Sequence, residues 1–218
     1  MIKLSPSMLA CNFANIGQDV EKVENAGADY LHIDIMDGHF VPNLSFGDCV
    51  VTSLRKVSRL VFDVHLMVDN PAAYIAPFAK AGADIITFHR EAASRIDCER
   101  IISDIKSHGM RAGISIKPGT PVSEITEFIP YVDMVLIMTV EPGFGGQKLI
   151  PETLDKVAQV AEMANKKGVC PDIQVDGGIT LENAHLATEK GANVLVAGSS
   201  VFKAQDRAKA INDLRKAK

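Results

Sequence analysis

Short runs of β-branched and other apolar residues alternate along this chain with longer stretches in which apolar residues recur every three or four positions. The short runs have the length of β-strands, and the longer stretches have the period of amphipathic helices. The pattern predicts eight strands, at residues 3–7, 30–34, 61–67, 85–89, 111–116, 134–140, 173–176 and 194–198. Between them it predicts helices, including residues 16–26, 72–81, 99–108, 151–167 and 181–190. Regular alternation of strand and helix indicates a parallel sheet with helical crossovers.

A short glycine-containing motif recurs where a helix is expected to end and a strand to begin. It reads Ala-Gly-Ala-Asp at residues 26–29 and 81–84, and Gly-Ala-Asn at residues 191–193. Glycine suits the left-handed residue that follows many helix C-termini. The repeat and the eight strands predict one α/β domain, residues 1–218, folded as a (β/α)₈ TIM barrel. A doubly wound dinucleotide-binding fold would need G-x-G-x-x-G after the first strand, where this chain has residues 8–12, Met-Leu-Ala-Cys-Asn.

Polar side chains are expected to converge inside one end of the barrel. Period two places His32 and Asp34 on the inward face of the second strand, His65 on that of the third, and Asp176 at the tip of the seventh. Catalytic groups collect at the C-terminal ends of barrel strands. Buried carboxylates need a compensating charge, and mixed nitrogen and oxygen ligands suit zinc, iron(II), cobalt or manganese better than calcium. The alternative is a buried His–Asp hydrogen-bond network, but four inward groups favour a metal site.

Three methionines are expected near the same end of the barrel. Met36, Met67 and Met138 lie at inward positions close to strand ends, where they could form the roof of the pocket. A thioether excludes water from a metal site without competing strongly for the metal. Ordinary core filling is the alternative interpretation.

Glycine-rich segments follow the last three predicted strands. Backbone N–H groups can approach a phosphate closely where side chains are absent, and the loops after strands seven and eight are a common phosphate site in barrels. The loop after strand six also has the composition of a hinged flap over the substrate. The residues concerned are Gly143, Phe144, Gly145, Gly146, Gly177, Gly178, Gly198 and Ser199.

Composition narrows the class of partner. The chain has 218 residues, 47% of them hydrophobic, and a formal net charge of −4. It has no run of lysine and arginine that would favour nucleic acid, no apolar stretch of about 18 residues, and no signal-peptide pattern. The four cysteines are widely spaced, so neither a disulfide framework nor a zinc ribbon is expected. We therefore expect a cytoplasmic protein without nucleic-acid or membrane partners.

Seven motifs, in order along almost the whole chain, closely resemble those of the ribulose-phosphate 3-epimerase family. They lie at residues 5–7, 32–43, 63–67, 118–121, 138–147, 175–179 and 197–199. The second and fifth are long enough to be highly specific.

The resemblance implies a metal-dependent isomerase of the pentose phosphate pathway, with a barrel of the ribulose-phosphate-binding type. The family interconverts D-ribulose 5-phosphate and D-xylulose 5-phosphate, and its members are homo-oligomers. Carried over by position, the metal ligands are His32, Asp34, His65 and Asp176, and the acid/base pair is Asp34 and Asp176. The resemblance implies one divalent ion per subunit, with Zn²⁺ first and Fe²⁺, Co²⁺ or Mn²⁺ as alternatives. The implied substrate contacts are Ser7, His65, Gly143 to Gly146, Asp176 to Gly178, Gly198 and Ser199.

Three other interpretations stay open at this point. The related allulose-6-phosphate 3-epimerase shares the metal ligands, although alanine is expected there in place of Gly145. A metal-independent decarboxylase would need a lysine on strand three, where this chain has His65. A phosphate-sugar binding barrel without catalysis is the third. Arg90 departs from the family pattern, which has a smaller or apolar residue, and it could alter the rim of the barrel or an oligomer contact.

Overall fold

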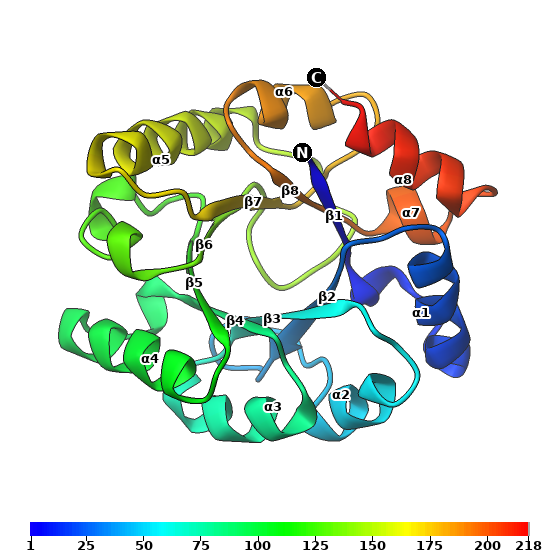
Figure 1. Ribbon diagram of the computed structural model, residues 1–218, viewed down its shortest axis with the longest axis horizontal. Helices are drawn as coiled ribbons and strands as arrows, with labels where there is room; N and C mark the ends of the chain where they lie inside the picture. Colours follow the sequence, from blue (N-terminus) through cyan, green and yellow to red (C-terminus); the bar gives the residue numbers. More distant parts are fainter. Residues whose placement is uncertain (218) are drawn as a thin grey trace.

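A computed structural model describes residues 1–217 as an eight-stranded parallel sheet closed into a barrel and surrounded by helices (Figure 1). The strands follow one another around the barrel in sequence order. They are β1 Lys3–Pro6, β2 Tyr30–Met36, β3 Val61–Met67, β4 Ile85–His89, β5 Arg111–Ile116, β6 Met134–Met138, β7 Asp172–Asp176 and β8 Val194–Ala197. A parallel bridge between Ser7 and His32 joins β1 to β2 and closes the barrel. The predicted (β/α)₈ fold is confirmed.

The helices form the outer layer, seen as a ring in Figure 1. They are α1 Ile16–Asn25, α2 Asp48–Arg55, α3 Ile75–Ala81, α4 Arg95–Ser107, α5 Leu154–Lys167, α6 Ala184–Glu189, α7 Ser199–Phe202 and α8 Arg207–Arg215. Two short 3₁₀ turns, Val122–Glu124 and Ile129–Tyr131, lie in the crossover from β5 to β6. Within residues 1–217, no helix has the length and apolar character needed to cross a membrane.

The glycines of the predicted repeat end their helices as expected. Gly82 follows α3 with φ of +97°, and Gly27 and Gly191 have φ of +90° and +108°. Few residues other than glycine adopt this left-handed conformation. The chain therefore turns sharply out of each helix and into the next strand.

Side-chain alternation in β2 separates the barrel interior from the helical layer. Leu31, Ile33 and Ile35 are buried in the large core between the strands and the helices. His32 and Asp34 are also buried, but on the opposite face, inside the barrel. The interior is polar at this level.

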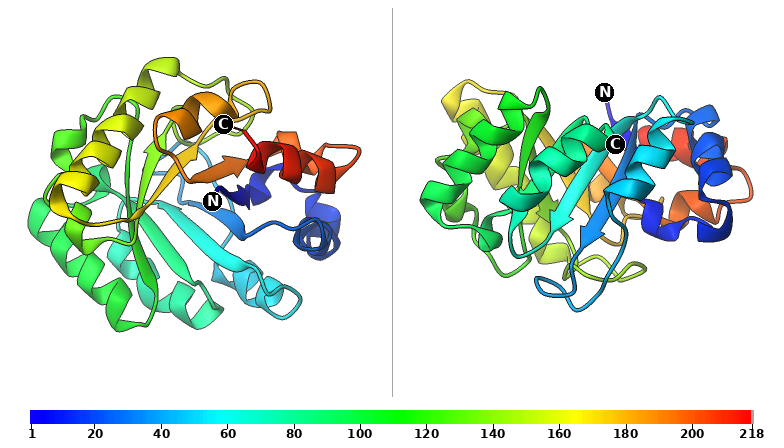
Figure 2. Two further views of the ribbon diagram at one scale, coloured as in Figure 1. Left: turned by 45° about the horizontal axis from the view of Figure 1, so that its top comes forward. Right: turned by 90° about the horizontal axis from the view of Figure 1, so that it is seen from below.

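The opposite end of the interior is closed by apolar side chains. Tyr30, Ile85, Met134 and Val194, from four different strands, pack against one another near the N-terminal strand ends. The C-terminal strand ends carry the long loops, which project at the lower edge of the right-hand view in Figure 2. The site is therefore restricted to the C-terminal end.

Candidate active site

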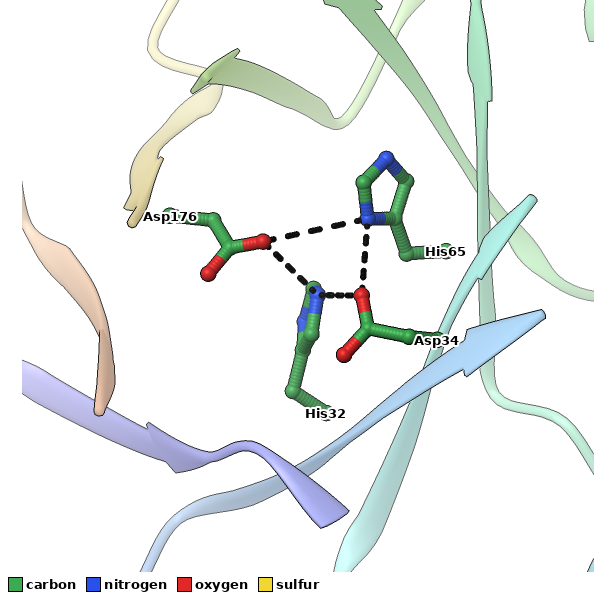
Figure 3. Close-up of side chains that lie close together, drawn as sticks. All are labelled: His32, Asp34, His65 and Asp176. Atoms are coloured by element: carbon green, nitrogen blue, oxygen red, sulfur yellow. Dashed lines mark hydrogen bonds and ion pairs between the residues drawn. The ribbon is translucent and has the colours of Figure 1, made fainter. Parts of the chain in front are cut away.

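Four side chains meet at the C-terminal end of the barrel interior (Figure 3). His32 and Asp34 come from β2, His65 from β3, and Asp176 from the last residue of β7. One nitrogen or oxygen of each lies within 4.8 Å of those of the other three. The register aligns Asp34 with His65 on the neighbouring strand, so strand geometry alone brings these two side chains together.

The distances between the four atoms are those of ligands around a small cation. His32 Nε2 lies 3.3 Å from Asp34 Oδ1 and 3.7 Å from Asp176 Oδ2. His65 Nδ1 lies 3.2 Å and 4.0 Å from the same two oxygens. Ligands at about 2.1 Å from a zinc ion are separated from one another by about 3–3.5 Å. A modest contraction of this group would surround one metal ion.

Burial makes a compensating cation the best fit for this group. His32 and His65 are fully buried, and the Asp34 side chain is 3% exposed. His32 Nε2 has no hydrogen-bond partner among the described residues, although it points at the two carboxylates. An unpartnered imidazole nitrogen beside two buried carboxylates fits a divalent metal with mixed nitrogen and oxygen ligands.

Asp63 orients the His32 ring through a hydrogen bond with Nδ1. The Asp63 carboxylate lies 2.8 Å from His32 Nδ1, so the protonated Nδ1 donates to it and Nε2 is left facing the ligand cluster. Ser5 and Gln174 donate to the same Asp63 oxygen at 3.0 Å and 2.6 Å. Period two places Asp63 on the same inward face of β3 as His65, but no sequence motif indicates its contact with His32.

The two carboxylates of the cluster have different electrostatic surroundings. Burial favours the neutral form of Asp34, but His32 and His65 outweigh burial and hold the pKa of Asp34 well below its usual range. Burial and the charge of Asp34 both raise the pKa of Asp176, to about 6. Burial opposes protonation of His32, but Asp34 and Asp63 outweigh it and raise its pKa well above the usual value. A strongly ionised carboxylate thus lies beside one that binds a proton readily.

A cavity of about 950 Å³ opens directly above these groups. Its lining includes Asp34 and Asp176, while His32 and His65 lie below its floor, buried beneath the two carboxylates. Every other residue expected from the sequence to bind substrate or cover the pocket also lines it, namely Ser7, Met36, Met67, Met138, Gly143, Phe144, Gly145, Gly146, Gly177, Gly178, Gly198 and Ser199. The structure therefore brings the predicted residues to one place.

Ser7 fixes the second oxygen of Asp34. Its hydroxyl donates to Asp34 Oδ2 at 2.9 Å, while Asp34 Oδ1 faces the two histidines. The Asp34 carboxylate is therefore held on both oxygens. Its orientation is set before any substrate arrives.

The loop between β6 and α5 covers one side of the cavity. Gln147 donates from Nε2 to the carbonyl oxygens of Glu141 and Phe144, at 2.7 Å and 2.9 Å, and so closes the loop on itself. Asn43, in the loop after β2, donates to the Gly143 carbonyl oxygen at 3.0 Å. Phe144 itself is 56% exposed. Polar contacts thus hold the backbone of the loop, while the apolar Phe144 side chain remains free to pack on a ligand.

Comparison with known proteins identifies the family. The family model described as "Ribulose-phosphate 3 epimerase family" matches residues 3–202. The Ribulose-phosphate 3-epimerase of Bacillus subtilis is 49% identical over the full length of both chains. The chloroplastic Ribulose-5-phosphate-3-epimerase of Arabidopsis thaliana is also 49% identical, over 100% of this chain and 77% of that protein, and the cytoplasmic isoform of Oryza sativa is 48% identical over 98% and 93%. The chain belongs to the ribulose-phosphate 3-epimerase family.

Solved structures with low sequence identity share the fold of this epimerase. KGPDC from Streptococcus mutans superposes with a TM-score of 0.73 at 14% identity, covering 100% of this chain and 97% of the other. A 3-hexulose-6-phosphate synthase superposes with a TM-score of 0.69 at 18% identity, covering 99% of both chains. These likenesses confirm the barrel fold, while the isomerase activity follows from the closely related epimerases.

Two residues of the epimerase outside the predicted set have clear structural roles. His89 is fully buried, and its Nε2 lies 2.9 Å from His65 Nε2. The sequence places His89 at the end of a predicted strand but predicts no partner for it, because spacing along one strand does not reveal contacts across strands. Arg90 lies on the rim, where it donates to the carbonyl oxygens of Ala93 and Glu124 and pairs with the Glu124 carboxylate at 3.0 Å. Arg90 thus joins the loops after β4 and β5.

Proposed function

We propose that this chain interconverts D-ribulose 5-phosphate and D-xylulose 5-phosphate, with Asp34 and Asp176 as the acid/base pair beside one bound divalent cation. The observation that carries the proposal is the convergence of two cavity-lining carboxylates with two fully buried histidines. Epimerisation at C3 requires removal of the proton next to the C2 carbonyl and its return to the opposite face of the sugar.

The positions of the two carboxylates support an acid/base role for both. Asp34 lies on β2 and Asp176 on β7, and β1 and β8 separate these two strands around the barrel. A sugar on the cavity floor would therefore have a carboxylate from each strand. One carboxylate takes the C3 proton as the C–H electron pair forms an enediolate, and the other, protonated, delivers a proton to C3. Ser7 donates to Asp34 Oδ2 and so fixes the orientation of this carboxylate.

His32, Asp34, His65 and Asp176 would hold the cation. When bound, it supplies positive charge that stabilises the negative charge developing on the substrate oxygens. Zn²⁺ fits the donor set of two imidazoles and two carboxylates best, and Fe²⁺, Co²⁺ or Mn²⁺ fit as alternatives. Asp63 holds the Nδ1–H tautomer of His32 that such a ligand requires.

The glycine-rich loops after β7 and β8 are suited to the phosphate group of the substrate. Gly177, Gly178 and Gly198 line the cavity, where the lack of side chains lets a phosphate approach the backbone N–H groups. Phe144 would pack over the bound sugar when the β6–α5 loop closes. The family resemblance further supports a homo-oligomer of single-barrel subunits.

The decisive experiment is incubation with D-ribulose 5-phosphate in D₂O, followed by NMR at C3. We expect deuterium at C3 and formation of D-xylulose 5-phosphate, both of which stop after chelation and return with added Zn²⁺, Fe²⁺, Co²⁺ or Mn²⁺. Full activity of metal-free protein would rule out the metal, and absence of C3 exchange in metal-loaded protein would leave a binding barrel without catalysis. D-allulose 6-phosphate in a parallel reaction tests the related hexulose activity, and faster exchange at its C3 would overturn the pentulose assignment.

A further inference from the structure

A buried chain of hydrogen bonds leads away from the ligand cluster through His65. One ring nitrogen of His65, Nδ1, faces Asp34 and Asp176, and the other, Nε2, lies 2.9 Å from His89 Nε2. On the far side of the second ring, His89 Nδ1 lies 3.2 Å from Glu91 Oε2. Both imidazoles are fully buried, and the Glu91 side chain is 21% exposed. No step of the proposed reaction uses His89 or Glu91.

Counting protons gives this series of hydrogen bonds a single direction, in which His65 donates to His89 and His89 donates to Glu91. If His65 Nδ1 offers its lone pair to a cation, the ring proton of His65 lies on Nε2. Two imidazole nitrogens 2.9 Å apart share one proton, so His89 Nε2 must accept and the proton of His89 must lie on Nδ1. That Nδ1–H then donates to Glu91, whose carboxylate can only accept.

Glu91 is itself fixed by the loop after β5. Its Oε1 accepts from the backbone N–H of Lys117 at 2.7 Å and from the Thr120 hydroxyl. The Lys156 ammonium, from α5, donates to the carbonyl oxygens of Lys117, Pro118 and Thr120, at 3.0, 2.6 and 2.6 Å. The Glu91 carboxylate is therefore held by the loop after β5, and Lys156 of α5 supports that loop in turn.

We propose that His89 and Glu91 are positioning residues that hold His65 in the tautomer that presents Nδ1 to the cation. The inference rests on the metal site of the proposed function and adds residues to it. The two histidine ligands are then oriented differently: His32 directly by the carboxylate of Asp63, and His65 through a second imidazole to the carboxylate of Glu91.

Replacing Glu91 by glutamine tests the direction of these hydrogen bonds, because the two side chains have nearly the same shape. The backbone N–H of Lys117 needs an acceptor, so the amide oxygen of the new side chain faces Lys117. The amide NH₂ then faces His89. His89 must then accept at Nδ1 and carry its proton on Nε2, where it opposes the proton on His65 Nε2. In the Glu91→Gln variant, the hydrogen bonds from residue 91 through His89 to His65 can all form only if the His65 proton moves to Nδ1. There it blocks the metal.

The first measurement is Zn²⁺ affinity by competition with a chromophoric chelator. We expect Glu91→Gln to bind Zn²⁺ about 10–100-fold more weakly than the wild type. The matched control is Glu124→Gln, which removes the same charge from the rim, where Glu124 pairs with Arg90, and should leave the affinity unchanged. Unchanged affinity in Glu91→Gln would overturn the inference, whereas a wild type that binds no Zn²⁺ would overturn the proposed metal site itself.

The second measurement separates positioning from simple structural support. His89→Gln keeps an acceptor oxygen near the position of Nε2, and His89→Leu does not, so Gln should retain Zn²⁺ affinity that Leu loses. In metal-free wild type labelled with ¹⁵N-histidine, imidazole NMR should show His89 protonated on Nδ1 and His65 on Nε2, with His89 assigned from its missing signals in His89→Gln. An Nε2–H tautomer of His89 in the wild type would overturn the inference even if a variant failed to fold.

Discussion

Asp34 and Asp176 carry the same side chain, yet their surroundings give them different affinities for a proton. Asp34 lies between two imidazoles and accepts from Ser7, so its ionised form is stabilised. Asp176 lies at the end of β7, is more exposed at 17%, and is opposed by the charge of Asp34. Environments that separate the pKa values of two carboxylates are typical of acid/base pairs.

We expect Asp34→Asn and Asp176→Asn each to lower kcat by at least about 10²–10⁴-fold, because an amide cannot transfer the C3 proton. Binding of the sugar phosphate, measured by calorimetry, should persist because the glycine-rich loops are unaltered. Asp155→Asn, which removes an exposed charge from α5, serves as the control. Near-normal turnover in either site variant would remove that residue from the acid/base pair.

At the scale of elements, the inward faces of strands could be predicted from the sequence, and contacts between strands could not. Period two correctly placed His32, Asp34 and His65 inside the barrel, because alternation is a property of one strand. The contacts of His32 with Asp63, and of His65 with His89, depend on the register between strands and on side-chain rotamers. Neither property can be derived from spacing along the chain.

Element boundaries show the same limit. The predicted strand 134–140 ends at Met138, because Thr139 bonds both to Asp176 and to Ile150 of its own loop. The predicted helix 181–190 begins only at Ala184, because Asn183 bonds to Thr180 and Gly178 and holds the preceding loop. Side chains that compete for backbone groups decide where an element begins, and their choice of partner depends on the folded loop.

Contact between two loops makes Gly178 a sensitive position. Gly178 has φ of +67°, and a Cβ there would lie 2.3 Å from the Leu149 backbone nitrogen. Gly178→Ala must therefore displace the β6–α5 loop in addition to a backbone cost of about 1 kcal/mol. We expect a rise in KM for the sugar phosphate of about tenfold or more, measured by steady-state kinetics. Gly119→Ala, where a Cβ would meet open space, should leave KM unchanged, and equal KM values in the two variants would contradict the argument.

On the scale of the whole molecule, the two ends of the barrel differ in function. The C-terminal end carries the candidate site, and the N-terminal end carries a polar cluster that ties strands together. Lys3 of β1 donates to both oxygens of Asp172 on β7, at 2.8 Å and 2.7 Å, and Tyr30 of β2 donates to the same carboxylate at 3.1 Å. Arg111 of β5 lies 3.5 Å from it. The cluster therefore spans the seam where β1 meets β2, which a single bridge at Ser7 closes at the other end.

The Lys3 contacts predict a stability difference that depends on pH and leaves catalysis unaffected. Burial lowers the pKa of Lys3, but its bonds to Asp172 and Tyr30 outweigh burial and raise it above the ordinary value of about 10.4. A raised pKa means that the contribution of Lys3 to stability is complete below that ordinary value and is lost as pH rises through the pKa of the folded state.

Because the Lys3 side chain is 35% exposed, we expect Lys3→Met to lower stability by roughly 1 kcal/mol, and Tm by about 2–4 °C. The gap in Tm should be constant between about pH 7 and 9 and narrow above about pH 10.4, while kcat/KM at pH 7.5 matches the wild type. A gap that stays constant into strong alkali would show that Lys3 stabilises the seam by packing of its methylene groups and not by its charge.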